Sequence, residues 1–340
     1  MKVQQVDALD FPEMENKLSY SGIDSWMNLV NAIYGYKIHR FAVTEDSHPL
    51  GALSLLEVKH PVFGHYLVTA PFGSYGGFAF ESDVARDLLL EEASQLAKET
   101  KVEYVAIRSE DGESERPANW IQQPSYFTYL IDLDHTPEEI LKTFSSDHRN
   151  HVRKSMKKGF TVRFGHLDLL DDIYEALSRS MHELGSPYHS KTYLRKMAEL
   201  LGDSLEFAVL YDSHGKIAGG GVFIVQGDTI FNLHANILRF VRSNYAGEYL
   251  YWSVIERGIQ KGLKIFDLGR SLVGSGNEVF KMKWAPQKKL LAYWHWLAPG
   301  TELPSLNQKN PKFQIAIAVW KRLPAFVVKP LGPYLVRGLA

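Results

Sequence analysis

The sequence contains no cysteine, which excludes disulfide bonds, thiolate metal sites and a cysteine nucleophile. This absence also fits a reducing compartment, so we expect a cytoplasmic protein. No run approaches the roughly 18 uninterrupted apolar residues of a membrane-spanning helix, and the N-terminus has no apolar stretch of signal-peptide length. The formal net charge is only −1, so overall electrostatics favour neither DNA nor an anionic membrane as a partner.

Two kinds of catalytic spacing are also missing. The chain has 13 histidines, yet no group of His, Asp and Glu has the sequence spacing of a metal site, and we expect no bound metal. No Ser–His–Asp signature is evident either. What remains is an ordinary globular composition, 45% hydrophobic and 23% charged over 340 residues. That length is enough for about two domains of ~150 residues each.

One order of predicted elements occurs twice. Three strands, a helix and a further strand fill 39–107, and the same order returns at 206–267. The segment Phe41–His48 recurs almost unchanged as Phe207–His214, which indicates a duplicated domain. The fold class is therefore α/β (α+β), with two mostly antiparallel mixed sheets flanked by helices, the element order of the N-acetyltransferase-like (GNAT) fold.

Domain boundaries follow from this repeat. We place the first domain at 1–135 and the second at 136–297, and we expect the tail at 298–340 to pack back on the first domain. From Pro304 the tail carries six Lys or Arg and no acidic residue. The prolines at 311, 324, 330 and 333 break it into pieces too short to span a bilayer. We expect Phe313–Trp320 to pack on the protein and Lys321–Ala340 to make a weak peripheral contact with the inner face of the membrane.

The stretch 136–158 predicts one long helix, which opens on a Thr-Pro-Glu-Glu capping box. Its second half is basic, with Arg149, Arg153 and Lys157 spaced four apart on one stripe. Such a stripe suits the phosphates of tRNA, CoA or a lipid carrier. An ordinary solvated helix face fits the same spacing equally well.

Reactive groups gather between 264 and 284. A short apolar strand ends at Asp267 and Gly269, and the chain then supplies a cation, hydroxyls, a glycine-rich turn and a short helix. The residues involved are Asp267, Arg270, Ser271, Gly274, Ser275, Lys281 and Trp284. Strand-end loops on rigid scaffolds often carry the chemistry of a fold. The plain alternative is an Asp267–Arg270 ion pair beside a solvated Lys281.

Polar residues also alternate on one predicted strand, at Asn232, His234 and Asn236. Alternate residues of a strand share a face, so we expect these three to line one cleft. An exposed sheet face would show the same alternation.

With these motifs in place, the sequence resembles the FemAB-type family of tandem GNAT-fold aminoacyl and peptidyl transferases. It resembles most closely the FemAB-related proteins associated with PEP-CTERM/exosortase and exopolysaccharide systems. The similarity covers nearly the whole chain. It rests mainly on the order Phe-Asp-Leu-Gly-Arg-Ser at 266–271, Gly-Ser-Gly at 274–276 and Phe-Lys-Met-Lys-Trp at 280–284, with weaker support from the glycine-rich loop around Tyr75.

This resemblance implies transfer of an acyl or aminoacyl group to an amine, without a metal or a bound cofactor. Lys281 would lie near the reacting carbonyl, where it could stabilise the oxyanion, as could the N–H groups around 274–276; Asp267 would take the amine proton. The expected substrate-binding residues are Arg270, Ser271, Gly274, Ser275, Asn232, His234, Asn236, Tyr75 and Trp284. Phosphate or tRNA would bind at Arg149, Arg153 and Lys157.

Two family motifs are absent. The pyrophosphate loop of acetyl-CoA-dependent members is replaced at 239–247 by bulky residues, and the acceptor-binding lysine of the first helix is missing at Val30-Asn31. The donor stays open between charged tRNA and acyl-CoA. We expect a transferase acting on a small-molecule or lipid-linked envelope precursor. An acyl-CoA-dependent N-acyltransferase and a non-catalytic binding or scaffold protein of envelope assembly are the alternatives.

Overall fold

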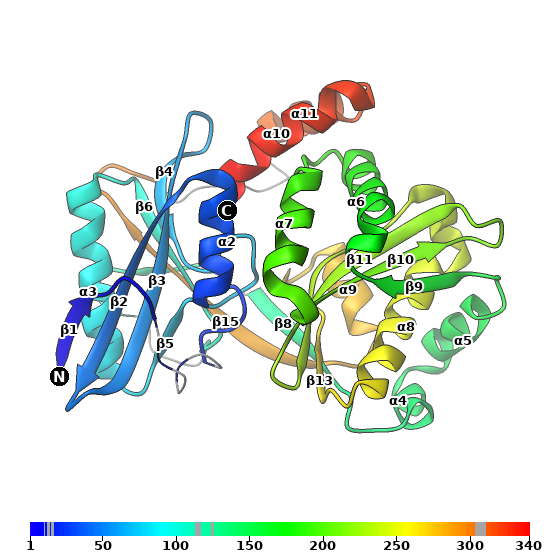
Figure 1. Cartoon of the computed structure of the whole chain (residues 1–340), viewed down its shortest axis with the longest axis horizontal. Coiled ribbons are helices and arrows are strands. Elements are labelled where there is room, and N and C mark those ends of the chain that lie inside the picture. The colour runs from blue at the N-terminus through cyan, green and yellow to red at the C-terminus, as the bar shows by residue number, and fades with distance from the viewer. Residues whose placement is uncertain (10, 12–13, 15–16, 113–116, 124–125, 303–310) are drawn as a thin grey trace. The chain divides into compact units, whose positions relative to one another are not determined.

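The structure is a computed structural model that describes residues 1–340 except 10, 12–13, 15–16, 113–116, 124–125 and 303–310. The chain forms two compact units (Figure 1). Unit 1 consists of 1–128, 289–305 and 337–340, and unit 2 of 129–288 and 306–336. The start of the basic tail, including Pro304 and Lys309, lies outside the described residues.

Unit 1 is a sheet with strand order β1-β2-β3-β4-β6-β15. Its elements are β1 (Lys2–Gln5), α2 (Asp24–Tyr34), β2 (Lys37–Glu45), β3 (His48–His60), β4 (Gly64–Val68), β5 (Phe78–Phe80), α3 (Asp83–Thr100), β6 (Tyr104–Ser109), β7 (Ile121–Gln122) and most of β15 (Gln287–Leu297). The strands pair antiparallel except β4 and β6, which pair parallel across the crossover helix α3. The apolar face of α3 packs on this sheet through Leu89, Ala93 and Leu96.

Unit 2 has the strand order β8-β13-β12-β11-β10-β9. Its strands and the helices between them are β8 (Tyr126–Asp132), α4 (Pro137–Thr143), α5 (Ser146–Ser155), β9 (Thr161–Gly165), α6 (Leu170–Leu184), α7 (Lys191–Leu201), β10 (Leu205–Tyr211), β11 (Ile217–Gln226), β12 (Thr229–Ile237), α8 (Ala246–Gln260), β13 (Ile265–Asp267), β14 (Ser271–Leu272) and α9 (Gly276–Met282). Short 3₁₀ turns lie at η1 (Leu167–Leu169), η2 (Gly202–Ser204) and η3 (Arg239–Asn244). The tail adds α10 (Pro311–Trp320), α11 (Ala325–Val336) and η4 (Arg337–Leu339).

The repeat predicted from the sequence is present in the fold. In unit 2 the strands β12 and β13 pair parallel across α8, as β4 and β6 do across α3 in unit 1. The three antiparallel strands that come before have the same order in both units, β2-β3-β4 and β10-β11-β12. Two copies of one supersecondary unit explain the duplicated sequence.

Three expectations about boundaries need correction. The domain boundary lies at 128/129 instead of 135/136, and 289–297 belongs to unit 1 because Ala292 to Leu297 of β15 pair with β6. The tail at 306–336 belongs to unit 2, and only its last four residues return to unit 1. Gly332 of α11 lies directly against the backbone of Tyr188, and a Cβ there would come within 2.9 Å of the Tyr188 carbonyl oxygen.

The expected long helix at 136–158 is two helices. The capping box at Thr136 and Glu139 forms as predicted. Phe144, however, has an extended backbone, with φ −72° and ψ 151°, and ends α4. Ser145 then starts α5 by accepting a hydrogen bond from the His148 N–H. The second capping residue, Ser145, thus divides a segment that its periodicity predicted to be one continuous helix.

Candidate functional site

The turn after β13 is built by Asp267. Its Oδ1 accepts a hydrogen bond of 2.7 Å from the N–H of Gly269, and its side chain is only 1% exposed. Gly269 has φ +77°, a conformation that favours glycine. The sharp strand-end turn expected from the sequence is therefore present. The Asp267 carboxylate is buried and holds the backbone of this turn through the bond to Gly269.

Lys281 of α9 lies buried beneath this turn. Its Nζ donates to the carbonyl oxygens of Gly269 at 2.7 Å and Arg270 at 2.8 Å. The same atom is 5.5 Å from the ring centroid of Tyr129. The side chain is 7% exposed, so the plain alternative of a solvated lysine is wrong.

Burial changes the protonation of Lys281. Removal from water lowers its pKa to about 7; the charge of Arg270 lowers it further, while that of Asp267 opposes the shift. A pKa near neutrality means that both the ammonium and the neutral amine are populated at pH 7. Such a group can donate or accept a proton during a reaction.

The loop before α9 is organised by Glu278. Its carboxylate accepts hydrogen bonds from the N–H of Gly274 at 2.6 Å and the hydroxyl of Tyr129 at 3.0 Å, and it pairs with Lys288 at 2.9 Å. The bond from Lys288, followed by that from Gly274, lowers the pKa of Glu278. Ser275 caps α9 by accepting from the N–H of Glu278. The Gly274 N–H and the Ser275 hydroxyl, expected to contact substrate, are thus engaged within the loop.

Two buried polar atoms near the turn lack partners in the described part of the chain. They are Oγ of Ser271 and Oδ1 of Asn232. The amide nitrogen of Asn232 donates to the hydroxyl of Tyr251 at 2.9 Å and to the carbonyl of Leu268 at 3.3 Å. Burial raises the pKa of Tyr251 to about 12. Buried polar atoms normally find partners, so these two atoms mark positions that a polar ligand or water can fill.

The expectation that Asn232, His234 and Asn236 share one face is wrong. Asn232 pairs with Phe223 on β11, whereas His234 pairs with the adjacent Val222, so Leu233 is the extra residue of a β-bulge. Consecutive residues of β11 point to opposite faces, and their partners on β12 do the same.

The contacts of these side chains agree with the bulge. Asn232 contacts Tyr251 of α8. The amide of Asn236 lies 3.2 Å from Sδ of Met181 on α6. The ring of His234 lies 5.7 Å from that of His189. Burial lowers the pKa of His234 to about 4, so its imidazole is neutral at pH 7, and its Nε2 has no partner among the described residues.

Trp284 and Tyr75 are both buried. Trp284 is 1% exposed and packs in an aromatic cluster with Phe144, His148 and Tyr251, which gives it a core role. Tyr75 lies in unit 1, where its carbonyl oxygen accepts a hydrogen bond from Ser21. Substrate contact by either side chain stays a prediction.

The basic stripe is only partly helical. Arg149 and Arg153 lie four residues apart on α5, half-buried and exposed respectively. Lys157 follows the end of α5 in a turn and is exposed. These cations are accessible to phosphates, and phosphate or tRNA binding at them stays a prediction.

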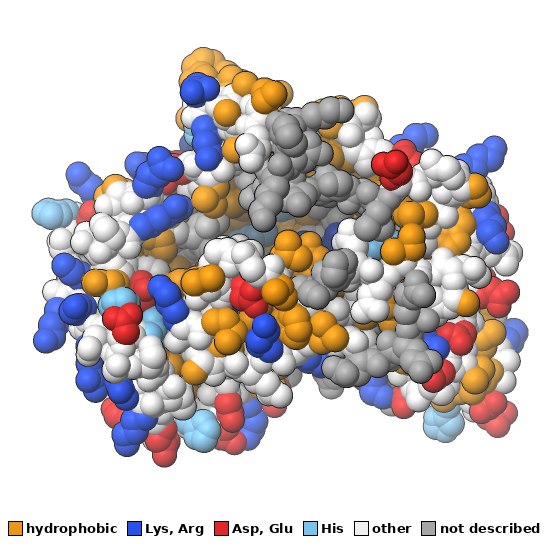
Figure 2. Space-filling model, turned by 180° about the vertical axis from the view of Figure 1, so that it is seen from behind, with side chains coloured by type: hydrophobic (Ala, Val, Ile, Leu, Met, Phe, Trp, Pro, Cys, Tyr) orange, Lys and Arg blue, Asp and Glu red, His pale blue; other side chains and the backbone are white. Residues whose placement is uncertain are grey.

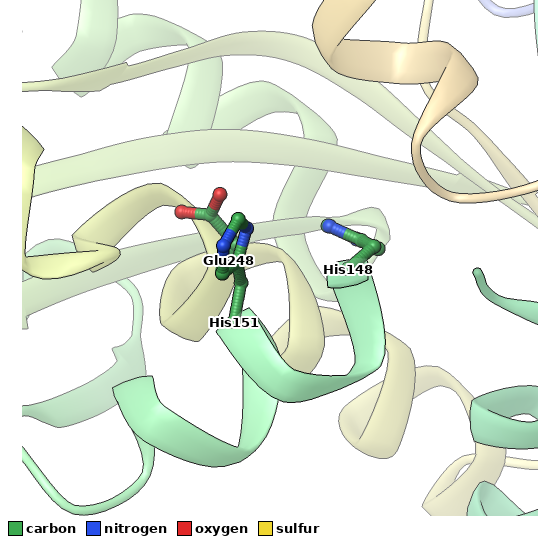
Figure 3. Close-up of side chains that lie close together, drawn as sticks. All are labelled: His148, His151 and Glu248. Atoms are coloured by element: carbon green, nitrogen blue, oxygen red, sulfur yellow. The ribbon is translucent and has the colours of Figure 1, made fainter. Parts of the chain in front are cut away.

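A possible metal-binding group was missed by sequence reasoning. His148 and His151 of α5 and Glu248 of α8 each place a ligand atom within 4.8 Å of the others (Figure 3). Burial lowers the pKa of His148 to about 4, so its imidazole is neutral at pH 7. The two histidines are three residues apart, a spacing that can be read from the sequence. Glu248 comes from a distant helix, and only the fold brings it to them.

Surface hollows lie elsewhere in each unit. One of about 650 Å³ in unit 2 is lined by residues that include Asp172, Arg179 and Phe240. Another of about 780 Å³ in unit 1 is lined by residues that include Trp120 and Trp296. Neither is lined by the residues predicted for the site, so the case for the Lys281 turn rests on buried chemistry and not on cavity size.

Comparisons with known proteins agree with this architecture. Residues 146–282 match the acetyltransferase (GNAT) domain family. The fold is similar to that of FemX, with a TM-score of 0.65 and 13% identity over 88% of this chain and 98% of that one. It is also similar to a tandem GNAT protein from the clavulanic acid biosynthesis pathway, with a TM-score of 0.56 and 12% identity over 88% and 100%.

A third similar structure is L-PGS from Bacillus licheniformis, with a TM-score of 0.54 and 15% identity over 87% of this chain and 91% of that one. Among curated protein sequences, none matches significantly. These findings confirm the predicted FemAB-like tandem GNAT fold and, through the acetyltransferase domain, the transferase class. The association with PEP-CTERM systems stays a prediction.

The burial of Lys281 predicts a pH-dependent stability. Its folded pKa of about 7 lies below its ordinary value of 10.5, so between these values the unfolded chain binds more protons. The contribution of Lys281 to stability therefore rises with pH across this window, by up to about 1.4 kcal/mol per pH unit. In Lys281→Met this rise is lost, and two carbonyls lose their donor at a further cost of about 1–3 kcal/mol each.

Urea unfolding followed by tryptophan fluorescence between about pH 6 and 10 measures the effect. The matched control is Lys283→Met, an exposed lysine in the same segment, which should follow the wild type. A difference between wild type and Lys281→Met that does not change with pH would contradict the low pKa.

Proposed function

Because residues 146–282 form an acetyltransferase (GNAT) domain within a tandem GNAT fold, we propose that the protein transfers an acyl or aminoacyl group to an amine of a cell-envelope or exopolysaccharide precursor. The observation that carries the proposal is the buried Lys281, with its pKa of about 7 and its bonds to two carbonyls of the strand-end turn. The motif order at 266–284, which resembles that of FemAB-type aminoacyl transferases, favours an aminoacyl donor.

In the proposed reaction an amide bond forms, and the ester or thioester bond of the donor breaks. The acceptor nitrogen attacks the carbonyl carbon of the donor, a C–N bond forms, and the bond from this carbon to the leaving oxygen or sulfur breaks. The proton lost by the amine passes to the leaving group. Negative charge develops on the carbonyl oxygen, so a fixed donor aimed at that oxygen lowers the barrier.

Lys281 is suited to be this donor. Its ammonium has three N–H groups, and two of them are fixed by the carbonyls of Gly269 and Arg270. The third remains for the oxyanion, in a place where removal from water strengthens the interaction. Asp267 is better suited to hold the turn and the charge of Lys281 than to take the amine proton, because its carboxylate is buried and engaged with Gly269.

We propose that the donor is not acetyl-CoA bound in the manner usual for this fold, because the N-terminus of α8 is not shaped for a pyrophosphate. That binding mode needs free backbone N–H groups at the start of a helix. Here the 3₁₀ turn η3 leads into α8, and the carboxylate of Glu248, only 8% exposed, lies in its first turn. A buried carboxylate repels a phosphate. Acyl-CoA is the second donor to test, because the similar tandem GNAT structure is described as a form without AcCoA.

Donor turnover by the purified protein tests the proposal. With aminoacyl-tRNA and a set of acyl-CoAs, we expect the charged tRNA to be consumed in the presence of an amine acceptor. Lys281→Met should lower turnover by about 10²–10³-fold, the usual effect of removing one fixed oxyanion donor, while Lys283→Met stays active. Arg153→Ala should weaken tRNA binding in a salt-dependent way.

Three results would contradict this scheme. Calorimetric binding of acetyl-CoA at micromolar concentration, competed by CoA alone, would favour the acyl-CoA reaction. Full activity of a folded Lys281→Met would remove Lys281 from the mechanism. Binding of the precursor without consumption of any donor would indicate the scaffold alternative.

We also propose that the tail docks weakly on an anionic membrane, which would bring the site to a lipid-linked acceptor. No helix of the described residues is long and apolar enough to cross a bilayer. Hydrophobic and cationic side chains lie together on the α10–α11 part of the chain, at the upper left of Figure 2. The exposed apolar residues of α11 are Phe326, Leu331 and Tyr334, and Lys321, Arg322 and Lys329 are exposed nearby.

The other face of the tail is anchored to unit 2. The indole N–H of Trp320 donates to the carbonyl of Ser186 at 3.1 Å, and Val328 is buried. The tail thus has a packed face and an exposed apolar, basic face, which is the arrangement of an interfacial helix. The C-terminal residues are a different case, because Arg108 binds the Ala340 carbonyl oxygen in unit 1.

Vesicle flotation tests the membrane contact. The protein should float with anionic vesicles at low salt and be released at high salt, since each cation near the surface contributes about 1 kcal/mol. Phe326→Ser with Leu331→Ser should weaken flotation without unfolding the protein. Val62→Ser changes an apolar residue of unit 1 whose exposure lies between those of Phe326 and Leu331, and it should have no effect. Deletion of the C-terminus is unsuitable because it removes the Ala340 contact. Failure of the wild type to float at low salt would exclude the membrane contact.

A further inference from the structure

The side chains of His148, His151 and Glu248 meet between α5 and α8 in unit 2. Both ring nitrogens of His148 lack a hydrogen bond among the described residues, and its side chain is 1% exposed. Figure 3 shows a ring nitrogen of His148 directed toward His151 and Glu248. Glu248 is 8% exposed. The ligand atoms of the three residues lie within 4.8 Å of one another.

The surroundings of this cluster are aromatic. The ring of His148 packs edge-on against Trp284 at 4.6 Å and against Phe144 at 5.3 Å. The ring of His151 stacks on Tyr245 at 4.5 Å. Leaving the His148 imidazole unpaired in such a place is costly, because its nitrogens cannot regain the hydrogen bonds of water. A ligand bound by a ring nitrogen of His148 would reduce that cost, and His151 and Glu248 lie close enough to bind the same ligand.

We propose that His148, His151 and Glu248 bind one divalent transition-metal cation, with zinc as the best match. Two imidazoles and one carboxylate form a ligand set that zinc and its neighbours accept. Mg²⁺ and Ca²⁺ prefer oxygen ligands throughout and should bind poorly. A tetrahedral zinc site places ligand atoms about 3.3 Å apart, so small side-chain rotations close the present spacing. A water molecule would complete the coordination.

Some charges near the cluster oppose cation binding and others favour it. Lys283 lies near enough for its positive charge to act on His148 and oppose a cation. Asp147 lies 3.4 Å from Nε2 of His151 and favours one. A carboxylate beside a metal-binding histidine commonly fixes the orientation of its ring. Asp147 and Glu248 thus place two carboxylates at the cluster, against the opposing charge of Lys283.

Metal binding would fix the helix that carries the basic stripe. The ion would tie α5, with Arg149 and Arg153, to the first turn of α8. Through the contact of His148 with Trp284 it would also support the segment just after Lys281. The metal would therefore be structural, and independent of the transfer reaction proposed for Lys281.

Zinc titration of the chelator-treated full-length protein tests this inference, with a chromogenic indicator as competitor and metal analysis after gel filtration. The wild type should bind one zinc per chain, and its unfolding temperature should rise with zinc. Glu248→Gln and His151→Asn should each lose at least 10-fold in affinity and most of the thermal shift. His214→Asn, which removes an exposed histidine elsewhere in unit 2, should behave as the wild type. MgCl₂ should produce no shift.

Two variants are used so that the test remains decisive if one of them fails to fold. Both are expected to fold, because His151 is only half-buried and Gln has nearly the same shape as Glu. Circular dichroism establishes which variants are folded. Absence of zinc binding by the wild type would overturn the proposal. Binding of equal affinity in the wild type, Glu248→Gln and His151→Asn would overturn it as well, because the zinc would then lie elsewhere.

Discussion

The two hydrogen bonds from the Lys281 amine to the carbonyls of Gly269 and Arg270 are the interaction on which the site depends. They connect α9 to the turn that ends β13, and they fix the lysine where water is excluded. Burial lowers the pKa of this lysine to about 7, a value no solvated lysine has. Its position, its charge state and the shape of the turn are therefore consequences of one arrangement.

The two units show how one supersecondary unit serves different ends. Both keep a parallel strand pair bridged by a helix. Both also carry Arg-Ser near the end of the second parallel strand: 108–109 are the last residues of β6, and 270–271 follow the turn after β13. In unit 1, Arg108 binds the carbonyl oxygens of Ala70 and Ala340, so its guanidinium secures a loop and the chain end. In unit 2 the carbonyl of Arg270 receives Lys281 instead, and the turn acquires a titratable group.

The sequence predicted the tandem GNAT fold from its repeated order of elements. It also predicted the capped start of α4 and the strand-end turn at Asp267, because each of these depends on neighbouring residues. It did not show that Lys281 is buried, since the carbonyls that bind it become neighbours only after folding. The bulge at Leu233 reverses the face of Asn232 relative to His234, and alternation alone cannot reveal an extra residue. The cluster of His148, His151 and Glu248 depends likewise on the packing of two distant helices.

The pKa of Lys281 is the quantity that tests this account most directly. It can be measured by carbon-13 NMR of the protein with labelled lysine ε-carbons, with the Lys281 signal assigned by its absence from the Lys281→Met variant. The account predicts a titration midpoint near 7. A midpoint near the ordinary value of 10.5 would show that the amine is solvated and that the buried turn site does not exist as described.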